Sequence, residues 1–307
     1  MKVWITGASG MVGKNLIEAS AGLSYVISGT GRDVDLFEPA AIRDHIRAFR
    51  PDLIIHAAGK VGGIQANMAA KDSFLYENTV MGLNLVREAS RAKVPRLLNL
   101  GSSCMYPKDL GKPLAEQDLL QAPLEPTNEG YALAKIVVAK MCEYLTKSNS
   151  AVSYKTLIPC NLYGRWDHFE SSRSHLIPSI IVKIRTAMIE GIHEIEIWGT
   201  GEARREFMYS GDFAQAVFNL IKHYDEIPEY LNVGLGYDYS INEYYQAAAK
   251  VAGFHGTFRH NADRPTGMKQ KLMDIGKLPD YAKVDSGLEQ GLLKTFQFYV
   301  AIQKSNH

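Results

Sequence analysis

The first thirteen residues of the chain, Met1–Gly13, read MKVWITGASGMVG, and this stretch decides the fold. It opens with a short apolar run typical of a buried strand, and Lys14–Ala21 then shows helical periodicity. Between them stand Gly7, Gly10 and Gly13. Glycines at this spacing permit a tight turn, so a pyrophosphate can rest on the positive N-terminus of the helix. A glycine turn that only packs a helix on a strand is the alternative, and the strand, loop and helix order favours a dinucleotide site.

The rest of the chain continues this pattern of short apolar runs and longer helical ones. Expected strands cover residues 25–28, 52–57, 96–100 and 154–158, with helices between them. After Gly164 come helical stretches at 177–189 and 240–252 and isolated strand-like pieces at 194–198 and 230–233. We therefore predict an α/β fold: a Rossmann-type, doubly wound parallel sheet over residues 1–164, joined by some later segments, and a smaller C-terminal substrate-binding lobe over 165–307. The ligand is expected between the lobes.

Composition narrows the class of protein. The 307 residues carry a formal net charge of +1 with both signs interspersed, which gives no electrostatic reason to expect nucleic acid or a membrane as partner. Three cysteines, Cys104, Cys142 and Cys160, form neither an even disulfide set nor a metal-binding spacing. The N-terminus lacks the long apolar core of a signal peptide, and no segment approaches the roughly 20 apolar residues of a membrane span. We expect a soluble cytoplasmic protein without a metal.

The loop after the second expected strand bears on the choice of cofactor. It reads Gly29-Thr30-Gly31-Arg32-Asp33. An acidic residue there would bond the ribose 2′-OH of NAD, and an arginine would accept the 2′-phosphate of NADP. Arg32 and Asp33 compete for this role, and both could instead be solvated loop charges. We favour Arg32 and NADP, because a buried phosphate needs a cation while a neighbouring aspartate can turn outward.

The candidate catalytic residues are concentrated in the segment from Gly101 to Lys135, which reads GSSCMYPKDLGKPLAEQDLLQAPLEPTNEGYALAK. Tyr131 and Lys135 are four residues apart, so on a helix the ammonium can lie beside the phenol and lower its pKa. Such a tyrosine can exchange a proton with a carbonyl oxygen. Ser102 directly follows an expected strand end and could donate a second hydrogen bond to that oxygen. A Tyr-x-x-x-Lys pair taken alone is more often a solvated pair, so the surrounding sequence carries the argument.

Several further motifs accompany these residues. They are AAGKVGGI at 57–64, GSSCMYP at 101–107, LEPTNE at 124–129, NLYG at 161–164, SHLIP at 174–178, and WGTG at 198–201 leading to REF at 205–207. With the N-terminal glycine loop they resemble the GDP-L-fucose synthase family of the extended short-chain dehydrogenase/reductase superfamily over nearly the whole chain. The resemblance implies an enzyme that inverts C3 and C5 of a GDP-4-keto-6-deoxy sugar and then reduces C4 with NADPH. We also expect a homodimer.

The resemblance assigns roles to individual residues. Cys104 and His175 match the acid/base pair of the inversion, and the chemistry fits, because the C4 ketone acidifies the protons on both flanking carbons. From the residues alone, the thiol could be a packed apolar group and the histidine an ordinary loop residue. Expected catalytic residues are Ser102, Cys104, Tyr131, Lys135 and His175. Expected cofactor contacts are Gly7, Ser9, Gly10, Met11, Val12, Gly13, Arg32, Ala57, Ala58, Tyr131, Lys135 and His175. Expected substrate contacts are Lys60, Lys183, Trp198 and Arg205, although Trp198 could be a core aromatic and Arg205 a surface partner of Glu206.

Three positions depart from the family pattern. Ser9 stands where the family often has an arginine, Gly130 where a proline is usual, and Lys183 where arginine is frequent. The alternatives are therefore a C4 reductase or epimerase/reductase of a related GDP-4-keto sugar from a colitose or deoxyheptose route. An NAD-dependent nucleotide-sugar 4-epimerase or dehydratase would share Ser102, Tyr131 and Lys135, but pairing Cys104 with His175 argues against it. A dinucleotide sensor without catalysis would be expected to lack the tyrosine or the lysine.

Overall fold

The computed structural model describes residues 1–170, 174–263 and 268–305. Its strands are β1 (Lys2–Thr6), β2 (Val26–Thr30), β3 (Leu53–His56), β4 (Arg96–Leu100), β5 (Ser153–Pro159), β6 (Asn161–Tyr163), β7 (Glu194–Trp198), β8 (Arg204–Arg205), β9 (Phe207–Tyr209), β10 (Tyr230–Val233), β11 (Tyr239–Ser240), β12 (Thr257–Asn261) and β13 (Gln270–Lys271). Its helices are α1 (Met11–Ala19), α2 (Pro39–Phe49), α3 (Ile64–Ala69), α4 (Lys71–Arg91), α5 (Glu129–Ser148), α6 (Leu176–Glu190), α7 (Ser210–Lys222), α8 (Ile241–Ala252) and α9 (Leu288–Ser305), with short 3₁₀ turns η1 (Ser103–Met105), η2 (Glu116–Asp118), η3 (Tyr224–Glu226) and η4 (Asp280–Ala282).

The central element is a six-stranded sheet in the order β10-β5-β4-β3-β1-β2, and every neighbouring pair is parallel. The predicted Rossmann-type sheet is confirmed. The chain moves to one side from β1 to β2 and to the other side from β3 onward, so the strand order reverses between β1 and β3. Ligands bind in such sheets beyond the carboxyl ends of the strands at this reversal. The glycine loop follows β1 and therefore lies at the expected place.

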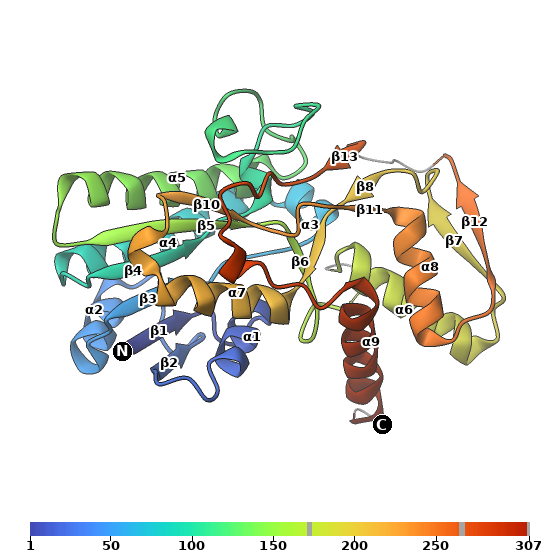
Figure 1. Cartoon of the computed structure of the whole chain (residues 1–307), viewed down its shortest axis with the longest axis horizontal. Coiled ribbons are helices and arrows are strands. Elements are labelled where there is room, and N and C mark those ends of the chain that lie inside the picture. Colours follow the sequence, from blue (N-terminus) through green and yellow to red (C-terminus); the bar gives the residue numbers. More distant parts are fainter. Residues whose placement is uncertain (171–173, 264–267, 306–307) are drawn as a thin grey trace.

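Alternation along the strands divides the core between the two faces of the sheet. Trp4, Ile54, Leu97 and Tyr154 point to the face covered by α2, α4 and α5. Their neighbours along the strands, such as Val3, Ile55 and Leu98, point to the opposite face, which α1 and α7 cover. Figure 1 shows α5 above the sheet and α1 and α7 below it. Helices on both faces explain why the strands read as continuous apolar runs.

The expected boundaries hold closely for β4, β7 and β10, which match residue for residue. The first helix begins at Met11 instead of Lys14, because Gly10 already has the extended conformation of a cap residue and the chain turns directly into the helix. None of the described helices has the combination of length and apolarity needed to cross a membrane.

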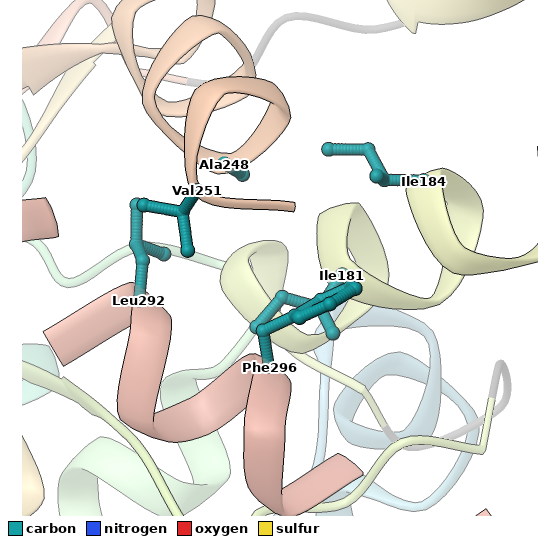
Figure 2. Close-up of a pocket in the computed structure, with 6 residues that line it drawn as sticks. All are labelled: Ile181, Ile184, Ala248, Val251, Leu292 and Phe296. Atoms are coloured by element: carbon teal, nitrogen blue, oxygen red, sulfur yellow. The ribbon is translucent and has the colours of Figure 1, made fainter. Parts of the chain in front are cut away.

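A second apolar cluster lies away from the sheet, among α6, α8, α9 and β7. Figure 2 shows Ile181 of α6 beside Phe296 of α9, and Val251 of α8 beside Leu292 of α9, with Ile184 farther along α6. β7 pairs in parallel with β12, and β8 lies between β11 and β13 in a small three-stranded sheet. These elements carry Lys183, Trp198 and Arg205, and the cluster fixes their backbone.

The closest helix contact on the sheet is between α4 and α5. Gly82 of α4 faces the buried Val138 of α5, and a β-carbon added to the glycine would overlap the valine methyls. Gly82→Ala gains about 1 kcal/mol of helix propensity, but overpacking against a stiff β-branched residue costs about 1–3 kcal/mol. We expect urea denaturation to show a net loss of stability. The double variant Gly82→Ala/Val138→Ala should lose less than the sum of the two single changes. A Gly82→Ala protein more stable than the parent would contradict this packing.

Candidate functional site

The loops after β1 and β3 touch at the reversal of strand order. Gly7 has a φ of +69°, and a β-carbon there would lie 2.6 Å from the Cα of Ala58. Gly10 is the N-cap residue of α1. Because glycine has no side chain, no side-chain cap occupies the N–H groups of the first helical turn. A pyrophosphate can accept hydrogen bonds from exactly such a free N-terminus. The loop therefore fits a dinucleotide. Gly7 tolerates no larger residue without moving the backbone, and neither does Gly13, where a β-carbon would overlap the Gly7 carbonyl oxygen.

A buried hydrogen bond braces these two loops from below. Thr6 Oγ1 lies 2.9 Å from Nδ1 of His56, and the backbone N–H of Ala58 donates to the same hydroxyl at 3.3 Å. Burial, with a smaller contribution from the charge of Lys135, lowers the pKa of His56 to about 3. The imidazole is therefore neutral at physiological pH. The sequence gives no local signal for this support, because His56 lies 50 residues after Thr6.

The loop expected to read the adenosine ribose separates its two charged residues. Asp33 Oδ1 accepts the backbone N–H of Gly31 at 2.6 Å, so the carboxylate turns back on its own loop. Arg32 is exposed. Ser9 stands opposite, with its Oγ 3.0 Å from the position that a β-carbon on Gly31 would take. This arrangement favours Arg32 over Asp33 as the residue that contacts a cofactor.

Four of the five expected catalytic residues come together beyond the carboxyl end of β4. Ser102 caps η1, and its hydroxyl accepts the Cys104 backbone N–H at 3.2 Å. Tyr131 approaches from α5 and shares a hydrogen bond with Ser102. Lys135, one turn later, donates to the Leu100 carbonyl at 2.9 Å, and its Nζ lies 5.7 Å from the centre of the Tyr131 ring. Serine, tyrosine and lysine thus form one cluster with the thiol.

The protonation of this group differs from the expectation. Burial raises the pKa of Tyr131, the nearby Cys104 raises it further, and the hydrogen bond to Ser102 opposes them. The prediction of a lowered tyrosine pKa is therefore wrong for the protein as described. Burial also lowers the pKa of Lys135, to about 8. Desolvation is the largest cause of both shifts, because Lys135 is buried and Tyr131 is half-buried. Tyr131 consequently holds its proton at neutral pH, as a proton donor should.

Two polar groups contact the sulfur of Cys104. The side-chain amide of Asn128 donates to Sγ at 3.1 Å, and the Lys271 ammonium lies 3.8 Å from it. Neither residue was assigned a role from the sequence. Asn128 lies within the quoted LEPTNE motif, three residues before Tyr131, so its proximity was detectable. Lys271 is 167 residues away from the cysteine along the chain, and no local pattern indicates the contact.

His175 occupies a different element. It is the cap residue of α6, and it is exposed at the surface. The surrounding protein lowers the pKa of His175, and the nearby His168 adds to this shift. The charged group that interacts with His175 is thus His168, in the segment before α6. Its expected pairing with Cys104 stays a prediction.

Two of the expected substrate residues, Lys183 and Trp198, lie side by side. Lys183 Nζ donates to the Glu196 carbonyl at 3.0 Å and to the Tyr245 hydroxyl at 3.2 Å, and it lies 5.5 Å from the Trp198 ring. Trp198 is 47% exposed, so the alternative of a core aromatic is wrong. An exposed indole beside a lysine offers a stacking surface and a cation together.

Arg205 and Lys60 have other partners than expected. The Arg205 guanidinium donates to the Arg204 carbonyl at 2.7 Å, and burial lowers its pKa. Glu206 does not form the suggested surface pair, because it is buried and accepts backbone N–H groups. Lys60 forms an ion pair with Glu77 of α4 at 2.6 Å. Its charge is already neutralised there, which weakens the case for Lys60 as a phosphate ligand.

Comparison with known proteins agrees with this geometry. Residues 3–234 match the family model described as NAD dependent epimerase/dehydratase family. The chain belongs to this family. GDP-L-colitose synthase from Yersinia pseudotuberculosis is 48% identical to this chain over 304 residues, which cover 98% of each of the two sequences. GDP-L-fucose synthase from Azorhizobium caulinodans is 47% identical over 301 residues, covering 97% of this chain and 96% of the relative.

Solved structures of the family extend the comparison to three dimensions. The GDP-mannoheptose C4 reductase MlghC from Campylobacter jejuni, solved with NADP bound, superposes with a TM-score of 0.86 at 28% identity. The alignment covers 97% of this chain and 98% of that one. The resemblance inferred from the motifs is confirmed by these family members.

The ribose loop yields a direct prediction. Arg32→Ala should weaken NADPH binding by roughly 10- to 150-fold, since a charge-assisted hydrogen bond to the 2′-phosphate is worth about 1.5–3 kcal/mol. Binding of NADH, which lacks that phosphate, should change little. Fluorescence titration of both cofactors measures this, with Arg47→Ala on the exposed face of α2 as the matched control. A parent protein that prefers NADH would make Asp33 the selecting residue.

Proposed function

We propose that this chain is an NADPH-dependent epimerase/reductase that inverts C3 and C5 of a GDP-4-keto-6-deoxy sugar and reduces C4, forming GDP-L-fucose. The observation that carries the proposal is the cluster of Ser102, Tyr131 and Lys135 around the accessible thiol of Cys104. A plain reductase needs only the first three residues. A thiol held among them is the extra acid/base that inversion requires. The GDP-sugar enzymes among the relatives support the choice of substrate.

For the reduction, NADPH supplies the hydride when it is bound. The glycine loop and the α1 N-terminus would hold its pyrophosphate, and Arg32 its 2′-phosphate. Ser102 and Tyr131 orient the C4 oxygen, and Tyr131 gives it a proton. A tyrosine with a raised pKa keeps this proton until the oxygen becomes strongly basic. Lys135, fixed by the Leu100 carbonyl, places positive charge where the phenolate forms.

For the inversion, we assign Cys104 and His175 to opposite faces of the sugar ring. One group removes the proton next to the ketone, and the other returns a proton from the far side. Lys183 and Trp198 would bind the GDP, together with Arg205, whose half-buried guanidinium has no carboxylate contact within hydrogen-bonding distance among the described residues. We propose that these residues belong to a substrate lobe made mainly of residues 165–307. The cofactor lobe would comprise residues 1–164 together with α7 and β10, which pack with the central sheet.

A second candidate product is GDP-L-colitose, because the colitose and fucose synthases match the chain almost equally. The two can be separated by incubating the protein with NADPH in D₂O, using GDP-4-keto-6-deoxy and GDP-4-keto-3,6-dideoxy hexoses in parallel. A substrate without a 3-hydroxyl has no configuration to invert at C3. NMR of the products identifies the preferred substrate and the inverted carbons. Reduction without deuterium uptake would show a simple C4 reductase, and turnover of neither substrate would overturn the proposal.

Tyr131→Phe should separate the two reactions. Loss of the proton donor is expected to slow C4 reduction by roughly 100- to 10,000-fold, because only reduction delivers a proton to the carbonyl oxygen. Deuterium uptake at C3 and C5 should stay measurable. NADPH absorbance and NMR follow the two steps, with Tyr25→Phe as control, since Tyr25 stacks on Phe218 outside the site. NADPH consumption at the parent rate would remove Tyr131 from this role.

We also infer a homodimer in the cytoplasm. The cellular location rests on the three free cysteines, Cys104, Cys142 and Cys160, because thiols stay reduced in a reducing compartment. The dimer rests on a row of exposed apolar residues along the packed pair α4 and α5: Leu75, Tyr76, Leu133, Val137 and Tyr144. The last three share one face of α5. A contiguous apolar surface of this kind is typical of an interface between subunits.

The dimer proposal can be tested by placing a charge in this row. Val137→Glu should shift the protein from dimer to monomer in light scattering at micromolar concentration, because a buried unpaired carboxylate is costly. Val26→Glu, at another exposed valine on β2, should leave the mass unchanged. A monomeric parent protein would contradict the proposal.

A further inference from the structure

Lys271 reaches the thiol of Cys104 from a distant part of the chain. Its Nζ lies 3.8 Å from Sγ, and both residues are partly exposed. The ammonium therefore lies beside a sulfur that substrate can approach. Neither the reduction nor the binding of the cofactor uses this contact.

The segment that carries Lys271 is held on both sides. β13 pairs with β8, where Lys271 is in register with Arg205. On its other side, the Leu114 N–H donates to the Leu272 carbonyl at 2.9 Å, and the Asp274 N–H donates to Leu114 at 2.9 Å. The ammonium is thus presented from a fixed backbone instead of a loose loop.

Glu206 completes the support. One of its carboxylate oxygens accepts the Met273 N–H at 2.8 Å, and the other accepts the Gly236 N–H at 3.0 Å. The carboxylate is buried and accepts hydrogen bonds from backbone N–H groups. It therefore anchors the segment of Lys271 without presenting an ion-pair partner to the ammonium at the thiol.

The groups around Cys104 favour negative charge on sulfur. Asn128, before α5, donates a hydrogen bond to Sγ, and Lys271, on β13, supplies a positive charge. Tyr131, on α5, is the other ionisable group whose charge interacts with the thiol, and it is neutral at physiological pH because its pKa is raised. A donor and a cation on one sulfur are the usual surroundings of a reactive thiolate.

We propose that Lys271 is a positioning residue that stabilises the thiolate of Cys104 and so equips this cysteine to remove a proton from the sugar. The inference rests on the inversion assigned above. The thiolate takes the proton from a carbon next to the ketone, and the electron pair of that C–H bond forms an enolate on the C4 oxygen. Protonation of the opposite face by the partner acid restores the ketone, and the cysteine returns its proton to solvent.

Alkylation of the thiol by iodoacetamide tests this in the protein without substrate. Cys142 and Cys160 are buried, so Cys104 is the accessible cysteine, and Cys104→Ser provides the blank. Lys271→Met should slow alkylation at pH 7 by roughly five- to tenfold, the effect of one charge at this distance in a largely hydrated site. The alkaline rise of the rate should move to higher pH. Lys271→Arg should retain most of the parent rate.

Lys269→Met is the matched control, since it removes one positive charge from an exposed position two residues away. Its alkylation rate should equal that of the parent. Deuterium uptake from D₂O by Lys271→Met should fall by the same factor as alkylation, while NADPH binding is unchanged. An unaltered alkylation profile of Lys271→Met overturns the proposal. If that variant then shows a higher KM for the GDP-sugar, Lys271 is assigned to binding the diphosphate of the substrate. Because alkylation needs no sugar, it stays informative even if the protein inverts no substrate.

Discussion

The approach of the β1 turn to the loop after β3 is the constraint on which the site depends. At Gly7 the backbone must take a left-handed conformation with no room for a β-carbon against Ala58. This contact places the N-terminus of α1 at the point where the strand order reverses. The next strand, β4, then delivers Ser102 and Cys104 at the same edge of the sheet, and α5 brings Tyr131 and Lys135 above them. A larger residue at position 7 would separate the cofactor from these groups without touching any of them.

Desolvation governs the chemistry of the assembled group. The surrounding protein raises the pKa of Tyr131, so the phenol keeps its proton, while burial lowers the pKa of Lys135 to about 8. Cys104 is half-buried, with polar donors around its sulfur. The two residues to which the proposed function assigns proton transfers thus lie in contrasting surroundings.

Much of the fold could be predicted from the sequence because its signals are local. The glycine turn, the apolar strands and the helical spacing of Tyr131 and Lys135 each depend on neighbours within a few residues. Features that depend on distant segments were missed or misjudged. The Lys60 charge meets Glu77 of a later helix, the Lys271 ammonium meets a cysteine 167 residues earlier, and the tyrosine pKa depends on burial that no spacing reveals. Tertiary packing decides all three.

The place of β10 at the edge of the central sheet bears on how the protein is made. β10 belongs to the same sheet as β1 to β5. The ribosome makes it later, however, because α6, β7, β8, β9 and α7 lie between β5 and β10 in the chain. Asn232 on this strand ties it to the Tyr106 hydroxyl and to the carbonyls of Leu114 and Asp274. Until it arrives on the ribosome, β5 exposes an unpaired edge, the kind of surface that recruits strands from other chains. The nascent chain therefore carries an open sheet edge from the synthesis of β5 until β10 has been made.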